Sequence, residues 1–152
     1  MIKKFILLAS WMILLFTVAD AQINNPVKWL FTAKKVTDKT YELYITANLE
    51  SNWHIYAQDS NESTGTSFSF SPNPLVKFDG KVKESGKMEK TYDPNVKSVL
   101  RYYSNQVDFI QKIKVRSTAT TLVKGTVTYI VCNDKKCLPP NEVPFSIKLA
   151  GK

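Results

Sequence analysis

Apolar and polar residues alternate with a period of two along most of the chain beyond residue 26. Because the side chains of a strand point alternately to the two faces of a sheet, this pattern is typical of strands with one buried face. No segment shows a sustained 3.6-residue period with helix caps. The pattern therefore predicts seven or eight short strands. Their apolar positions include Val27, Trp29, Phe31 and Ala33; Tyr41, Leu43, Ile45, Ala47 and Leu49; Val107, Phe109, Ile113 and Val115; Val127, Tyr129 and Val131; and Val143, Phe145, Ile147 and Leu149.

Turn-forming residues separate these segments. They lie at residues 37–39, at Asp79-Gly80 and at Lys124-Gly125, and the longest irregular stretch is a polar loop at 58–67. Short strands with turns between them, in roughly 130 residues, indicate one domain. We expect it to be all-β, an antiparallel sandwich of immunoglobulin-like type over residues 22–152.

The first 21 residues have the pattern of a cleaved secretory signal. Lys3 and Lys4 precede an apolar stretch at 5–18, and Ala19-Asp20-Ala21 supplies a small-residue cleavage site. A stretch of about 14 apolar residues is shorter than the ~20 needed to cross a bilayer. We therefore predict export, followed by removal of residues 1–21, and a mature chain that does not span the membrane.

The formal charge of +8 is the only compositional hint of a nucleic-acid partner. The lysines are scattered singly along the predicted strands, no dense basic run or nucleic-acid motif is present, and the chain is predicted to be exported. Solvated strand lysines that discourage edge-to-edge aggregation explain the charge better, so we expect no nucleic-acid partner.

The two cysteines of the chain, Cys132 and Cys137, are separated by four residues in a polar loop that Pro139 and Pro140 close. Cysteines this close can form a disulfide without movement elsewhere in the fold. The loop-entropy estimate for a ring of about six residues is only ~2 kcal/mol, against roughly 4.7 kcal/mol for a ring of about a hundred. The spacing favours a redox-active pair over a structural staple, which is the alternative.

Charged neighbours affect the ionisation of these thiols in opposite directions. Lys135 and Lys136 would stabilise a thiolate here, although Asp134 would oppose them.

Two other uses of close cysteines, a metal site and a protease, are less favoured. Structural zinc takes four ligands, and the chain offers two cysteines and one histidine, so we expect no metal. A Cys–His protease is disfavoured because a nucleophile beside a second cysteine would be locked as a disulfide in an oxidising compartment.

An aromatic segment precedes the polar loop. The alternation puts Trp53, Ile55 and Ala57 on one strand face, and His54 and Tyr56 on the other. Pattern alone favours a core tryptophan with two polar aromatic residues at the surface. The functional alternative is that His54 and Tyr56 pack beside the cysteine pair and control access to it.

Taken together, these motifs resemble a known family. Residues 129–132 read Tyr-Ile-Val-Cys, residues 137–140 read Cys-Leu-Pro-Pro, and His54-Ile55-Tyr56 forms the aromatic strand. In this order, over roughly residues 27–149, the chain resembles the N-terminal periplasmic domain of the bacterial thiol:disulfide interchange protein DsbD. The resemblance implies an immunoglobulin-like sandwich with a redox pair at one end and no organic cofactor.

The resemblance also implies roles and partners. Such domains pass reducing equivalents from a membrane-embedded partner to periplasmic thioredoxin-fold proteins, which isomerise disulfides or serve cytochrome c maturation. Cys137 would form the mixed disulfide with the partner, and Cys132 would resolve it. The capping loop of the family would fall at residues 91–94, so Tyr92 and Asp93 join His54 and Tyr56 as candidates to shield the pair.

Three departures from the family pattern qualify this interpretation. The best-known members separate the cysteines by five residues rather than four, and His54 replaces one of their strand tyrosines. The chain also ends at Lys152, so we expect a stand-alone module whose membrane-embedded electron donor is a separate polypeptide. The alternative function is a secreted immunoglobulin-like binding module with a passive disulfide.

Overall fold

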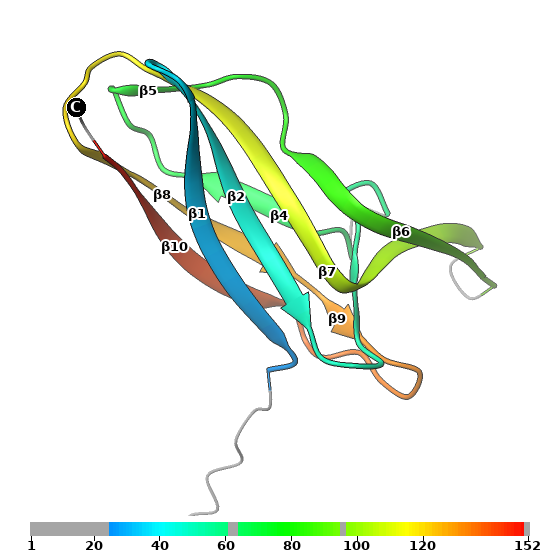
Figure 1. Ribbon diagram of the computed structural model, residues 1–152. Helices are drawn as coiled ribbons and strands as arrows, with labels where there is room; N and C mark the ends of the chain where they lie inside the picture. The colour runs from blue at the N-terminus through cyan, green and yellow to red at the C-terminus, as the bar shows by residue number, and fades with distance from the viewer. Residues whose placement is uncertain (1–24, 61–63, 95–96, 151–152) are drawn as a thin grey trace, which may run out of the picture.

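The alternating segments form two antiparallel sheets that pack face to face in the computed structural model (Figure 1). The structure describes residues 25–60, 64–94 and 97–150. The predicted signal at 1–21 lies outside the described residues. The all-β sandwich expected from the sequence is confirmed. The strands are β1 (Val27–Thr37), β2 (Thr40–Leu49), β3 (His54–Tyr56), β4 (Ser67–Phe70), β5 (Val76–Phe78), β6 (Lys83–Asp93), β7 (Ser98–Val115), β8 (Thr121–Tyr129), β9 (Val131–Cys132) and β10 (Asn141–Leu149).

The large sheet is organised around the 18-residue strand β7. Strands β2 and β3 follow each other along one edge of β7, and β6 and β5 pair with its other edge. Strand β1 extends the sheet beyond β2, and β9 extends it beyond β3. The small sheet has the order β10-β8-β4. The short β3 is therefore held between the long central strand and β9, which carries Cys132.

The chain changes sheets immediately before the cysteine loop. Strand β8 ends at Tyr129 in the small sheet, and two residues later β9 pairs with β3 in the large sheet. Strand β10 then returns to the small sheet beside β8. The loop at 133–140 consequently projects from one end of the sandwich, far from the C-terminal end of β10 (Figure 1).

The apolar positions of the sequence pattern form one core between the sheets. Both sheets contribute side chains that are completely or almost completely buried. From the large sheet these include Leu43, Ile45, Val107, Phe109 and Ile113, and from the small sheet Val123, Val127, Phe145 and Ile147. Gln111 is the polar exception on the inner face of β7. Its side-chain amide donates to the backbone carbonyls of Asp79, Gly80 and Lys112, so its burial is compensated by hydrogen bonds.

One turn prediction is wrong. Lys124 and Gly125 lie inside β8 rather than between strands. A Cβ on Gly125 would come within 2.5 Å of both the Phe145 ring and the Ser69 carbonyl oxygen. The glycine therefore permits close packing within the small sheet, which local sequence cannot distinguish from a turn signal. The turns after Thr37 and at Gly80, where φ is +77°, are confirmed.

The segment at residues 91–94, where the sequence predicts a capping loop, is mostly strand. Residues 91–93 are the end of β6, paired in register with residues 98–100 of β7. The two strands form a hairpin that extends away from the small sheet (Figure 1). Because both faces of this ribbon carry polar residues, its sequence lacks the apolar alternation that marked the other strands.

Candidate functional site

The cysteine loop is a tight hairpin fixed by backbone hydrogen bonds. The Asn133 N–H donates to the Lys136 carbonyl, and the Leu138 N–H donates to the Val131 carbonyl, both at 2.9 Å. These bonds place Cys132 and Cys137 opposite each other with their Cα atoms 4.0 Å apart, and a disulfide joins them. Hydrogen bonds within the loop itself therefore help to hold the two sulfurs together.

The side chain of Asn133 determines the turn. Its Oδ1 accepts hydrogen bonds from the backbone N–H groups of Lys135 and Lys136, each at 2.9 Å. This is the pattern by which asparagine stabilises a turn through its own side chain. Pro139 and Pro140 follow, where fixed φ angles stiffen the exit of the loop.

The two cysteines differ sharply in exposure. Cys132 is only 2 % exposed, within a small cluster that includes Tyr56 and Leu100. Cys137 is an exposed residue on the outer arm of the hairpin. Of the pair, Cys137 is therefore the one that another protein can approach.

Strand β3 brings the aromatic segment to the same place. His54 pairs with Cys132 of β9 on one side and with Ser104 of β7 on the other. The rings of His54 and Tyr56 meet edge-on with centroids 5.5 Å apart, and the centroid of Tyr102 lies 4.6 Å from that of His54. Ile55 faces the core and is completely buried. The structure thus brings His54 and Tyr56 together with Cys132.

Burial dominates the electrostatics of this cluster. Burial lowers the pKa of His54, although the charges of Asp134 and Glu89 act in the opposite direction. Burial also raises the pKa of Tyr56, and the neighbouring Asp93 adds to the effect. Both side chains are therefore favoured in their neutral forms beside the sulfurs.

The remaining shielding candidates lie on opposite faces of the β6–β7 hairpin. Tyr92 pairs with Val99 and is 62 % exposed, whereas Asp93 pairs with Ser98. Since alternate residues of a strand share a face, Asp93 is on the face of Leu100 and Tyr102, and Tyr92 is on the other. The structure therefore does not place the Tyr92 ring on the side of the hairpin that carries the cysteine cluster.

Sequence reasoning missed Tyr102, Leu100 and Ile130, which line the cysteine cluster. Tyr102 is followed by Tyr103, which is buried in the main core and donates a hydrogen bond to Glu84 at 2.8 Å. Two adjacent tyrosines in a strand must face opposite sides, so one of them was available for the outer face. Only the pairing of β3 with β7 shows which element that outer tyrosine meets.

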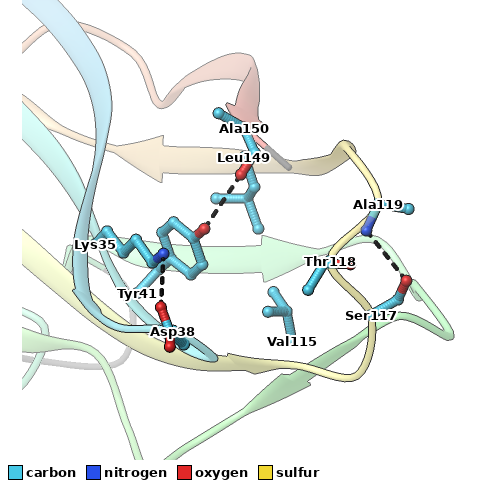
Figure 2. Close-up of a pocket in the computed structure, with 9 residues that line it drawn as sticks. All are labelled: Lys35, Asp38, Tyr41, Val115, Ser117, Thr118, Ala119, Leu149 and Ala150. Atoms are coloured by element: carbon cyan, nitrogen blue, oxygen red, sulfur yellow. Dashed lines mark hydrogen bonds and ion pairs between the residues drawn. The ribbon is translucent and has the colours of Figure 1, made fainter. Parts of the chain in front are cut away.

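The end of the sandwich away from the cysteine loop holds a small cavity (Figure 2). The Tyr41 hydroxyl donates to the Ala150 carbonyl there at 3.2 Å, and Lys35 pairs with Asp38 at 3.1 Å. The cavity measures only about 10 Å³, roughly the room for one water molecule. It is far smaller than the several hundred Å³ of a usual ligand site.

Residues 25–60, 64–94 and 97–150 contain no group of three or more metal-ligating side chains. Nor do they contain a helix that is long and apolar enough to cross a bilayer.

Comparison with solved structures identifies similar folds. The reduced N-terminal domain of DsbD from Neisseria meningitidis matches with a TM-score of 0.52 and 17 % identity, covering 81 % of this chain and 86 % of that one. The N-terminal periplasmic domain of ScsB from Proteus mirabilis matches with a TM-score of 0.57 and 16 % identity, covering 83 % of this chain but 47 % of that one. These likenesses establish an immunoglobulin-like fold.

A third solved structure is a complex between the DsbD and PilB N-terminal domains from Neisseria meningitidis. It matches with a TM-score of 0.47 and 15 % identity, covering 78 % of this chain and 80 % of that one. No curated protein matches the sequence. The model of the family described as "Thiol:disulfide interchange protein DsbD, N-terminal" matches residues 22–148. The chain therefore belongs to the DsbD N-terminal domain family.

Proposed function

We propose that this chain is an exported thiol–disulfide interchange module that transfers reducing equivalents through the Cys132–Cys137 pair. The observation that carries the proposal is the asymmetry of the pair, with Cys137 exposed and Cys132 buried behind it. In the reduced form, the Cys137 thiolate attacks a partner disulfide, and one partner sulfur leaves as a thiolate. Cys132 then attacks Cys137, which releases the second partner thiol and closes the disulfide.

The partners proposed for this exchange are exported proteins of thioredoxin fold, and the compartment is the periplasm. Family membership and the predicted signal at 1–21 support both. A separate membrane-embedded protein would return the pair to the reduced state. The exchange needs no organic cofactor, because the electrons move between sulfur atoms alone.

Trapping of mixed disulfides tests the assignment of the two sulfurs. Cys132→Ser should accumulate a covalent complex with a thioredoxin-fold partner through Cys137, because the sulfur that would release the partner is missing. Cys137→Ser should accumulate far less, because the remaining thiol is buried. Non-reducing electrophoresis against a panel of exported thioredoxin-like proteins measures both variants. Equal trapping by the two variants, or none by either, would contradict a directional relay.

The reduction potential separates exchange from the alternative of a binding module with a passive disulfide. Structural disulfides usually have potentials below about −300 mV, whereas exchange proteins lie above that value. Equilibration of the protein with thiol–disulfide buffers gives the potential directly. A value far below about −300 mV would favour the passive disulfide.

A further inference from the structure

The chain has one histidine, and the fold places it directly across from the buried cysteine. His54 of β3 and Cys132 of β9 are antiparallel register partners, so both side chains leave the same face of the sheet. Residues opposed in this way have Cβ atoms about 4.5–5.5 Å apart. At that separation an imidazole nitrogen is within reach of a thiol on the neighbouring strand.

The resolving step needs a base at this position. When Cys137 is bound to a partner, Cys132 carries a free thiol that must lose its proton before it can attack. The side chain is 2 % exposed and packs with Tyr56 and Leu100. Apolar burial disfavours a thiolate, so this thiol ionises less readily than an exposed one. The neighbouring tyrosine hydroxyl is also a poor base while it keeps its own proton.

We propose that His54 accepts the proton of the Cys132 thiol while that sulfur attacks the mixed disulfide at Cys137. This inference rests on the proposed function, since it concerns the step that releases the partner. The sulfur–sulfur bond between Cys137 and the partner breaks, and the bond between Cys132 and Cys137 forms. In this step Cys132 is oxidised, Cys137 remains at the disulfide level, and the partner sulfur is reduced and leaves as a thiolate. The proton stays on the imidazole until solvent or the leaving thiolate takes it.

The surroundings of His54 favour this role. The groups that face it are Tyr56 on its own strand, Tyr102 on β7, Asp134 in the cysteine loop and Glu89 on β6. Burial outweighs the two carboxylates and lowers the pKa of His54, so the imidazole is neutral and able to accept a proton near pH 7. As the pH falls through this lowered pKa, the imidazole becomes protonated and the base is lost.

A two-phase reaction separates this step from the preceding one. The fully reduced protein is mixed with one equivalent of dithiobis(nitrobenzoate), a small aromatic disulfide whose released thiolate absorbs light. The first thionitrobenzoate reports the attack by Cys137, and the second reports its displacement by Cys132. Stopped-flow absorbance follows both phases over about pH 5 to 9, a range that spans the ordinary pKa values of histidine and cysteine.

The second phase should depend on His54 while the first does not. His54→Gln should slow the second phase at least about tenfold near pH 7, a conservative share of the 10²–10⁴ typical of general base catalysis. Added imidazole should restore part of the second phase in His54→Ala. In the wild type the second phase should be nearly level above the pKa of His54 and should lose rate only as the pH falls through it, whereas unassisted ionisation of the thiol would give a rate that keeps rising toward pH 9. Tyr44→Phe is the control. The hydroxyl that it removes donates a hydrogen bond to Glu42 elsewhere on the large sheet, so both phases should be unchanged.

The outcomes distinguish this inference from the proposed function. A second phase that keeps its wild-type rate in His54→Gln, with no imidazole effect in His54→Ala, would overturn the role of His54 and leave the relay intact. A wild-type protein that shows no second phase, or in which Cys132 reacts first, would overturn the relay itself. The wild-type pH profile requires no variant, so the test stands even where a substitution impairs folding.

Discussion

Reduction of the Cys132–Cys137 disulfide should leave the sandwich folded. The ring spans about six residues, for which the loss of loop-closure entropy in the unfolded chain is worth about 2 kcal/mol. The main core lies between the two sheets and includes neither cysteine, whereas Cys132 belongs to a separate small cluster with Tyr56 and Leu100. The disulfide therefore adds a modest increment to a fold that the core already stabilises.

This increment affects both the unfolding equilibrium and the reduction potential of the pair. A difference of about 2 kcal/mol changes the unfolding equilibrium about 30-fold, since about 1.4 kcal/mol is a factor of ten. By linkage, the same energy makes the disulfide of the folded protein harder to reduce than that of the unfolded chain by about 40 mV. A stabilisation this small shifts the reduction potential of the folded pair only slightly, so the pair can still exchange with a partner. A much larger stabilisation would make the disulfide too hard to reduce.

Urea denaturation of the oxidised and reduced wild type measures the increment. Both forms should unfold cooperatively with similar slopes, and the midpoint of the reduced form should be lower by about 1 M for a slope of ~2 kcal/mol/M. Comparison within the wild type is cleaner than comparison with Cys132→Ser/Cys137→Ser, because a serine hydroxyl at 132 would be buried. Loss of the cooperative transition on reduction, or a difference above about 4 kcal/mol, would refute the reasoning and make the disulfide a structural staple.

Two further substitutions test the packing and the shielding of the site. Gly125→Ala should destabilise the protein by at least about 1–3 kcal/mol, measured as a lower urea midpoint, because its Cβ would collide with the Phe145 ring and the Ser69 carbonyl; an unchanged midpoint would contradict this packing. Tyr102→Ala should speed the reaction of the reduced protein with a small thiol reagent, because the Tyr102 ring lies beside the cysteine cluster. Tyr92→Ala should leave this rate unchanged, because Tyr92 lies on the other face of the β6–β7 hairpin; a faster reaction would instead support a lid at residues 91–94.

Parts of the site could be read from the chain because they are local. The cysteine spacing determines that a disulfide of this size can close, and Asn133 and the two prolines determine the shape of the loop. Period-two alternation determined the all-β class, because burial of one sheet face requires it. It also assigned His54 and Tyr56 to the face opposite Ile55, which is where the structure has them.

Other parts depended on contacts between distant segments. Local sequence gave residues 91–94 the polar character of a loop, but pairing with β7 makes residues 91–93 a strand and turns Tyr92 away from the cysteine cluster. Tyr102 becomes part of the site only because β3 pairs with β7 at that register.

The amino-acid sequence by itself determined the fold class, the loop and the pair of sulfurs, since each follows from residue spacing along one segment. Only the tertiary structure decided that Cys132 is buried, Cys137 is exposed and His54 lies opposite Cys132. The physical reason is that the chain leaves the small sheet after β8, and the next strand, β9, pairs with β3 in the large sheet. Strand partners are chosen by the packing of the whole core, so no local pattern encodes which side chains meet across them.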